Sequence, residues 1–377
     1  MISRNSCTNC APPTMVNDDT RWMKLALALG ARGLGRVWPN PAVGCVIVKD
    51  GRLLGRGWTQ PSGRPHAETM ALAQAGDAAR GATAYVTLEP CAHHGKTPPC
   101  ATALVAAGIA RVLCPLKDPD PRVSGLGFEL LREAGVSVDT GLMEAEAREA
   151  NQGFLLKTTY NRPMLTLKLA TSLDGRIATA QGESRWITGP AARASVHYMR
   201  ACHDAVLIGR GTAKADDPML DIRGLGLARA NPVRIVVDSG LSLSLESRLA
   251  RSAQDMPLWL CHNDAPEEKQ AAWQALGAKL IEVNRAENGL DMADLMAKLA
   301  SKGLTRVLCE GGGQLAASLI TANLIDRLEV FHAGLLLGDG GTPALGPLPF
   351  DALADFPRFK LDGVKRLGPD TLASYTP

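Results

Sequence analysis

Pro65-His66-Ala67-Glu68 and, at residues 87–100, TLEPCAHHGKTPPC are the two stretches that decide how the first half of this chain folds. The first stretch is expected to open a helix, whereas the second ends a strand near Cys91 and opens the next helix at Cys100. His66, Cys91 and Cys100 form a His/Cys/Cys ligand set. Three such ligands leave one position of a tetrahedral Zn²⁺ free for water, which is typical of a catalytic site.

Glu68 supports a catalytic interpretation of this zinc site. It follows the ligand His66 by two residues, so it can move a proton beside the metal without binding it. This H-x-E pattern followed by Pro-Cys is the signature of zinc nucleobase deaminases, in which two residues separate the cysteines. Here residues 92–99, AHHGKTPP, separate them. The sequence therefore predicts a deaminase site with an enlarged loop between two of its ligands.

Two other interpretations of these residues remain open at this point. His93 or His94 could join Cys91 and Cys100 in a local structural zinc knuckle. Alternatively, the cysteines could simply be buried, with His66 unrelated to them. A structural zinc has no use for a carboxylate that is not a ligand, so Glu68 favours the deaminase.

Helical and strand patterns alternate along both halves of the chain, which predicts two mixed α/β domains. The length of 377 residues also favours two domains over one. The first is expected at residues 18–160, with a charged helix at 144–160 leading to the boundary. The second is expected at residues 161–377 and begins with the strand 164–170.

The second half contains a strand, a glycine-rich turn and a helix in succession. The strand is expected at residues 306–309, the turn is Glu310-Gly311-Gly312-Gly313-Gln314, and the apolar helix spans 315–320. Such a turn lets backbone N–H groups and the helix dipole hold a phosphate group. It matches neither G-x-G-x-x-G nor the P-loop lysine motif, so a tight turn without a ligand is also compatible with it.

The bulk composition narrows the class of protein. The formal net charge is +3 with the signs interspersed, and aromatic residues make up 4%, which disfavours nucleic-acid binding. No apolar run reaches transmembrane length, and residues 1–19 lack the apolar core of a signal peptide. We therefore expect a cytoplasmic protein with no membrane or nucleic-acid partner. The nine cysteines do not suggest a disulfide framework, and Cys7 and Cys10 are interpreted as part of a polar leader rather than a metal site.

These stretches resemble the bifunctional riboflavin-biosynthesis deaminase/reductase family. The matching runs in the first half are PNPAVGCVIVKDG, HAE and TLEPCAHHGKTPPC; those in the second half are KLATSLDGRIA, GESRWITG, VLIGRGTAKADDPML, RIVVDS and CEGGGQLAASL. The resemblance implies a cytidine-deaminase-like zinc domain followed by a dihydrofolate-reductase-like domain. It also implies one Zn²⁺ per chain, NADPH, and a ribosylaminopyrimidine phosphate as substrate, in a homo-oligomeric enzyme.

The resemblance further implies roles for individual residues. In the deaminase half, Asn40, His93 and Lys96 would contact the substrate. The NADPH site would be lined by Ala170, Trp186, Thr212, Asp216, Ser239, Gly312, Gly313, Gln314, Leu315, Ala316, Ala317 and Ser318. The reductase substrate would contact Lys168, Ser184, Arg200, Leu220, Arg223 and Glu310. Arg200 and Arg223 are suited to clamping its phosphate, because guanidinium groups bind phosphate through paired N–H donors. At Ala170 the family often has glycine.

Two alternative functions follow from the same features. One is a tRNA or nucleoside deaminase with an unrelated C-terminal domain, which would need a basic or aromatic RNA-binding surface. The other is a non-catalytic nucleotide sensor stabilised by zinc, in which Glu68 would have no task.

Overall fold

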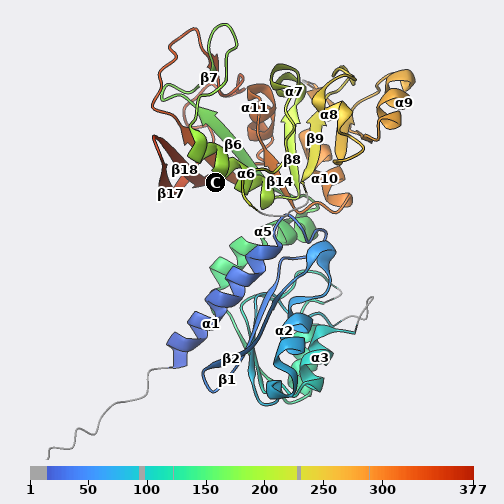
Figure 1. The fold of residues 1–377 in the computed structure, drawn as a ribbon, viewed down its shortest axis with the longest axis vertical. Coiled ribbons are helices and arrows are strands. Elements are labelled where there is room, and N and C mark those ends of the chain that lie inside the picture. The colour runs from blue at the N-terminus through green and yellow to red at the C-terminus, as the bar shows by residue number, and fades with distance from the viewer. Residues whose placement is uncertain (1–14, 93–97, 122, 227–230, 288) are drawn as a thin grey trace, which may run out of the picture. The chain divides into compact units, whose positions relative to one another are not determined.

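A computed structural model describes residues 15–92, 98–121, 123–226, 231–287 and 289–377. They form two compact units (Figure 1). The first contains the described residues up to Gly33 together with Ala42–Asn151, and the second contains Leu34–Pro41 together with Gln152–Pro377. His93 and Lys96, as well as Cys7 and Cys10, lie outside the described residues.

The first unit is built on one mixed sheet with the strand order β2-β1-β3-β4-β5. Its strands are β1 Gly44–Lys49, β2 Arg52–Trp58, β3 Thr83–Val86, β4 Arg111–Cys114 and β5 Ser137–Thr140. Its helices are α1 Met15–Gly30, α2 Ala67–Ala75, α3 Cys100–Ala106 and α4 Leu126–Glu133, and α5 Glu144–Tyr160 spans the end of the unit. β1 pairs antiparallel with β2 and β3, whereas β3, β4 and β5 are parallel.

Two glycines in β2 fix the position of α2. A Cβ atom at Gly55 would lie 2.1 Å from the carbonyl oxygen of Ala71, and one at Gly57 would lie 2.3 Å from that of Ala67. Only glycine therefore allows the backbone of α2 to pack this closely against the strand. The close approach sets the N-terminus of α2, where the predicted His66 and Glu68 lie.

The second unit contains a nine-stranded sheet with the order β11-β10-β9-β8-β14-β6-β15-β18-β17. The strands are β6 Met164–Thr171, β8 Ala205–Gly209, β9 Val233–Val237, β10 Leu258–His262, β11 Lys279–Glu282, β14 Arg306–Cys309, β15 Arg327–His332, β17 Lys360–Leu367 and β18 Asp370–Thr376. Two short ribbons pair β7 Arg176–Ala178 with β16 Thr342–Pro343 and β12 Arg285–Ala286 with β13 Gly289–Leu290. The strands from β11 to β15 in this order are parallel, so their carboxyl ends share one edge, where α/β sheets bind ligands.

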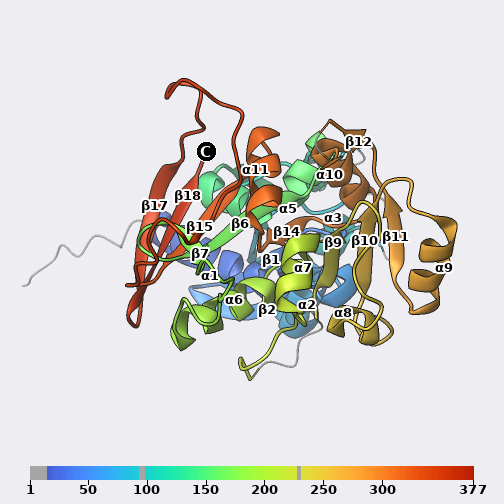
Figure 2. The same cartoon turned by 90° about the horizontal axis from the view of Figure 1, so that it is seen from above.

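Helices cover both faces of this sheet (Figure 2). The helices are α6 Pro190–Ala201, α7 Arg210–Asp216, α8 Arg248–Arg251, α9 Glu267–Ala275, α10 Met292–Ser301 and α11 Gly313–Thr321. α10 and α11 pack in the core that contains Leu207, whereas α7, α8 and α9 pack in the core that contains its neighbour Val206. Successive strand residues point to opposite faces, so these two cores lie on opposite sides of the sheet.

The segment Leu34–Pro41 groups with the second unit although its neighbours in sequence belong to the first. Trp38 packs against the core of the second unit. A similar close contact involves α5, since a Cβ atom at Gly153 would lie 2.5 Å from the carbonyl oxygen of Thr305. The division after Asn151 therefore falls inside α5, and the predicted boundary at 160/161 stays a prediction.

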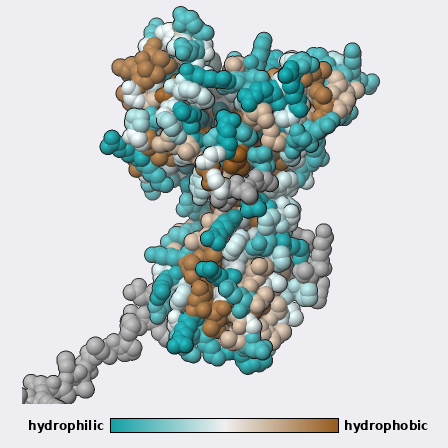
Figure 3. All heavy atoms as spheres, viewed as in Figure 1, coloured by the Kyte–Doolittle hydropathy of each residue, from teal (hydrophilic) through white to brown (hydrophobic). Residues whose placement is uncertain are grey.

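The predicted α/β class is confirmed, but the C-terminal hairpin β17–β18 was not predicted. β17 is an edge strand whose residues are exposed except for Leu367, so no burial pattern marks it in the sequence. On the visible face of the molecule, hydrophilic residues predominate and apolar residues form small groups, one of them along α1 (Figure 3). No helix among the described residues is long and apolar enough to cross a membrane.

Candidate active sites

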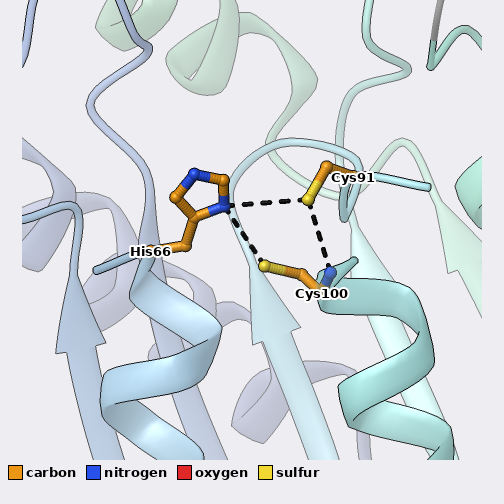
Figure 4. Close-up of side chains that lie close together, drawn as sticks. All are labelled: His66, Cys91 and Cys100. Atoms are coloured by element: carbon orange, nitrogen blue, oxygen red, sulfur yellow. Dashed lines mark hydrogen bonds between the residues drawn. The ribbon is translucent and has the colours of Figure 1, made fainter. Parts of the chain in front are cut away.

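His66, Cys91 and Cys100 converge in the first unit, as predicted (Figure 4). His66 immediately precedes α2, Cys91 follows β3 and Cys100 is the first residue of α3. Their ligand atoms lie within 4.8 Å of one another, with His66 Nδ1 3.3 Å from Cys100 Sγ and 3.7 Å from Cys91 Sγ. One nitrogen and two sulfurs at this spacing suit Zn²⁺, which binds such donors at about 2.0–2.3 Å.

The surrounding backbone prepares Cys91 for metal binding. Cys91 Sγ accepts a hydrogen bond of 3.3 Å from the N–H of Cys100, and the Cys91 carbonyl oxygen accepts one from Ala101. Hydrogen bonding from the Cys100 thiol, and further hydrogen bonding from His66, lower the pKa of Cys91 to about 4. These hydrogen bonds favour the thiolate of Cys91, which is the form that binds metal.

Glu68 lies in the first turn of α2 and its side chain is buried. Burial, and secondarily the negative charge of Cys91, raise the pKa of Glu68 to about 7. A carboxyl group with a pKa near neutrality can both accept and release a proton at the pH of the cell. The position and the environment of Glu68 thus agree with a proton-transfer role beside the ligands.

Glu89 is a residue that the sequence analysis did not single out. Its buried carboxylate accepts hydrogen bonds from the backbone N–H groups of Asp118, Gly125 and Gly127 at 2.9–3.0 Å. A Cβ atom at Gly127 in the first turn of α4 would lie 2.1 Å from the carbonyl oxygen of Pro90, so this helix packs closely against the residue that precedes Cys91. Glu89 therefore fixes the segment that carries Cys91, a predicted zinc ligand. The only signal in the sequence was its place directly before Pro90-Cys91.

The glycine-rich turn of the second unit lies at the carboxyl end of β14 and leads into α11. Gly312 is the N-cap of α11, and a Cβ atom there would lie 3.0 Å from Thr212 Oγ1 of α7. Gly311 has φ +94°, a backbone conformation that favours glycine. The turn thus leaves a side-chain-free cradle beside a hydroxyl group at the start of a helix, which fits a phosphate group of a nucleotide.

A half-buried charged cluster lies at the same edge of the sheet. Glu310 accepts two hydrogen bonds from Arg200, Nε to Oε1 at 2.6 Å and Nη2 to Oε2 at 2.8 Å. Arg200 Nη1 also donates to the carbonyl oxygen of Asp221 at 2.9 Å. Burial raises the pKa of Glu310, but the charge and hydrogen bonds of Arg200, together with the charge of Lys168, outweigh this effect, so the net shift is downward. Burial lowers the pKa of Lys168, which lies near this pair.

The two arginines of the predicted phosphate clamp have different surroundings in the structure. The guanidinium of Arg200 holds the Glu310 carboxylate, whereas Arg223 is exposed and its Nη1 lies 3.2 Å from Asp221 Oδ1. The sequence alone predicts the same role for both arginines, because spacing does not reveal their partners.

The other predicted residues lie on several elements. Ser184 donates to Asp216 Oδ1 at 3.3 Å, and Trp186 is 67% exposed under the Arg193 guanidinium. Asn40 donates its backbone N–H to the Val37 carbonyl oxygen in the segment Leu34–Pro41. The remaining predicted residues are placed on β6 (Ala170), on the loops after α7 and β9 (Leu220, Ser239), and at the start of α11 (Gly313, Gln314, Leu315, Ala316, Ala317, Ser318).

Comparison with known families identifies similarities in both units. Residues 16–116 match the model of the cytidine and deoxycytidylate deaminase zinc-binding region, and residues 163–373 match the model of the RibD C-terminal domain. The riboflavin biosynthesis protein RibD of Escherichia coli is 42% identical over 364 residues, which cover 93% of this chain and 97% of that protein. RibD of Aquifex aeolicus is 38% identical over 95% of this chain and 98% of that protein.

Solved structures resemble the whole chain. Acinetobacter baumannii RibD superposes with a TM-score of 0.86 and 38% identity, covering 97% of this chain and 100% of that one. The diaminohydroxyphosphoribosylaminopyrimidine deaminase/5-amino-6-(5-phosphoribosylamino)uracil reductase of Thermotoga maritima gives a TM-score of 0.85 and 33% identity, with 97% and 100% coverage. The similarity therefore extends over both units.

Proposed function

The chain belongs to the RibD family of riboflavin-biosynthesis proteins, and from that premise we propose how its two units divide the reaction. The chain is a bifunctional enzyme, a deaminase of the hydrolase class and an NADP-dependent reductase. Its cofactors are Zn²⁺ and NADPH. A nucleoside or tRNA deaminase with an unrelated second domain, and a sensor without turnover, are not favoured, because the second unit matches the RibD C-terminal domain.

The proposed substrate is the 2,5-diamino-6-ribosylamino-pyrimidinone 5′-phosphate that such a deaminase/reductase would process. The first unit removes an exocyclic amino group, and the second reduces the ribosyl chain to ribityl, giving 5-amino-6-ribitylamino-uracil 5′-phosphate. The observation that carries this proposal is the buried Glu68 beside three converging ligand atoms, in one chain with a glycine-rich nucleotide cradle.

In the deaminase unit, His66, Cys91 and Cys100 hold the metal and Glu68 moves protons between water and the pyrimidine. Zinc supplies activation of water and the nicotinamide supplies a hydride, when each is bound. Burial keeps the pKa of Glu68 near the pH at which it must exchange protons. Asn40, His93 and Lys96 are proposed as contacts of the substrate.

In the reductase unit, the glycine turn and the start of α11 would hold the dinucleotide, together with Ala170, Trp186, Thr212, Asp216 and Ser239. Lys168, Ser184, Arg200, Leu220, Arg223 and Glu310 would hold the substrate. Arg200 is supported as a positioning group by its paired hydrogen bonds to Glu310, which fix that carboxylate in the site. Arg223, which is more exposed, is proposed as the group that meets the substrate phosphate.

Further proposals concern the domain boundaries, the oligomeric state and the cellular compartment of the enzyme. We propose that residues 18–160 act as the deaminase domain and residues 161–377 as the reductase domain. We also propose a homo-oligomer, supported by the edge strand β17, whose exposed Leu361 and Val364 are available to a second copy. The free thiols of seven described cysteines, two of them zinc ligands, support a reducing compartment such as the cytoplasm.

The proposal is tested with purified protein, the diamino ribosylamine phosphate and NADPH. Ammonia release and NADPH oxidation are followed together in one sample. We expect both, with ammonia appearing first. NADPH oxidation without ammonia release, or neither, would contradict the proposed substrate.

A further inference from the structure

The C-terminal hairpin packs against α6 in the second unit (Figure 1). Leu367 and Leu372, on the two strands of the hairpin, lie in the same apolar cluster as Ala192 of α6. The turn between the strands reaches the start of this helix, because a Cβ atom at Gly189 would lie 3.6 Å from Pro369 Cγ. The last two strands of the chain therefore lie against the helix that follows the predicted NADPH contacts near residue 186.

Asp370, the first residue of β18, has a buried side chain at this contact. Its Oδ2 accepts a hydrogen bond of 2.7 Å from the backbone N–H of Gly189, the N-cap of α6. The next residue, Pro190, has no N–H group to offer. A carboxylate at this end of a helix is further stabilised by the helix dipole. One side chain near the end of the sequence thus holds the start of α6.

Gly189 ends a segment that begins at Ser184 and carries Trp186, a residue proposed to contact NADPH. At one end of this segment, Ser184 donates a hydrogen bond of 3.3 Å to Asp216 of α7. At the other end, Gly189 donates to Asp370. Between these two attachments the side chain of Trp186 is 67% exposed. Because so little of the ring is packed, its position depends on the backbone that carries it and on the few groups that touch it.

One of these groups, Arg193, belongs to α6. Arg193 Cζ lies 4.5 Å from the centroid of the Trp186 ring, and Arg193 Nη1 donates to the carbonyl oxygen of Thr188 at 2.7 Å. Arg193 follows the N-cap Gly189 by one helical turn, so a displacement of the helix start would move its guanidinium as well. The place of the N-terminus of α6 therefore sets the place of the exposed ring.

We propose that Asp370 is a positioning residue for NADPH binding, which fixes the start of α6 and, through Arg193, the ring of Trp186. Asp370 acts without touching the cofactor. A site whose parts are held in place before the ligand arrives binds it more tightly, because less conformational freedom is lost on binding. The inference rests on the proposed contact between Trp186 and NADPH, and it gives the C-terminal hairpin a task in the reductase.

NADPH binding to variants of the full-length chain tests this inference. Asp370→Ala removes the acceptor, whereas Asp370→Asn keeps a carbonyl oxygen in its place. Loss of a hydrogen bond to a charged group shifts an equilibrium by about tenfold. By fluorescence titration we expect about tenfold weaker binding in Asp370→Ala, and binding within about threefold of the wild type in Asp370→Asn. Asp362→Ala is the matched control and should change nothing, because this exposed aspartate of the same hairpin accepts from Thr376 on the neighbouring strand.

Two further measurements distinguish positioning from a general loss of structure. With the deaminated compound as substrate, Asp370→Ala should raise the KM for NADPH about tenfold. It should leave kcat at saturating NADPH within about twofold, and ammonia release from the diamino compound unchanged. Trp186→Ala should also weaken NADPH binding. Adding Asp370→Ala to that variant should weaken binding by less than about twofold more, because the ring that Asp370 positions is then missing.

Wild-type NADPH affinity in Asp370→Ala, or fully additive losses in the double variant, would overturn the inference. A fall in kcat together with a fall in ammonia release would also overturn it, by showing that Asp370 maintains the fold instead. The expected loss of affinity in Asp370→Ala, with recovery in Asp370→Asn, supports the inference even where the wild-type chain fails to reduce the deaminated compound. That failure would contradict the proposed function alone.

Discussion

In the deaminase unit the three predicted metal ligands and Glu68 come from one segment between His66 and Cys100, whereas the residues proposed for the reductase site lie between Lys168 and Ser318. The first site is organised by a metal, whose ligands must approach within bonding distance of one point. The second binds an extended dinucleotide and substrate along the edge of a parallel sheet, so it draws residues from many strands. A metal site can therefore be compact in sequence, while a nucleotide cleft depends on the whole fold.

The largest expected effect concerns the deaminase site. Glu68→Gln should keep zinc and lower the rate of ammonia release by about a hundred- to ten-thousand-fold, the usual contribution of general acid/base catalysis. Zinc is measured by atomic absorption and ammonia by a coupled assay. NADPH oxidation with the deaminated compound is the internal control and should stay at the wild-type rate. Near-normal deamination in this variant would remove Glu68 from proton transfer.

The corresponding change in the reductase site, whose residues come from many strands, is Gly312→Val. Its side chain would enter the cradle beside Thr212 Oγ1, so NADPH affinity should fall by about a hundredfold. Gly363→Val on β17 is the matched control, because a Cβ atom there meets no atom within 4 Å. Fluorescence titration with NADPH measures both variants, and ammonia release should be unaffected in each. Wild-type affinity of Gly312→Val would exclude the turn from the cofactor site.

Glu89→Gln tests whether the deaminase site depends on residues other than its predicted metal ligands and Glu68. All the recorded partners of the carboxylate are N–H donors, and an amide would turn its own NH₂ group toward them. Loss of such supporting contacts commonly lowers metal affinity by about ten- to a hundredfold. Competition with a zinc chelator measures this affinity, and Glu129→Gln on the exposed side of α4 is the control. Equal zinc affinity in the two variants would show that Glu89 does not position Cys91.

The smallest effect concerns separation of the units. A fragment that begins at Asn161 lacks Gly153, which packs against Thr305, whereas one that begins at Gln152 keeps it. Both lack Trp38. We expect both fragments to fold, with the shorter melting a few degrees lower, as befits the loss of about 1 kcal/mol in a domain of this size. Thermal unfolding followed by circular dichroism compares them, and an equal or higher midpoint for the shorter fragment would show that residues 152–160 add no stability to the reductase domain.

The sequence predicts His66, Cys91 and Cys100 as zinc ligands because their residue types, and their places next to the ends of a predicted strand and two helices, are visible locally; the structure brings their ligand atoms together. It also predicts the strands 164–170 and 306–309, because their apolar residues pack in the core and are visible as apolar stretches in the sequence. The role of Glu89 in holding the segment of Cys91 could not be predicted, because its hydrogen-bond donors lie at residues 118–127 and reach Glu89 only in the folded chain. The pairing of Arg200 with Glu310, which lie far apart in the chain, was hidden for the same reason. The hairpin of β17 and β18 was not predicted, because its outer strand is exposed on both faces and shows no alternation of apolar and polar residues.

The segment Leu34–Pro41 belongs to the second unit although it lies within the sequence of the first. This arrangement limits how the two activities can be separated in evolution. The chain enters the second unit, returns to the first, and leaves it again after Asn151. No single break in the gene would therefore give two proteins that each keep all of their own residues. A free-standing reductase descended from such a chain would have to replace the packing of Trp38 with a side chain of its own. A free-standing deaminase would carry a short loop with an apolar tryptophan that has lost its core.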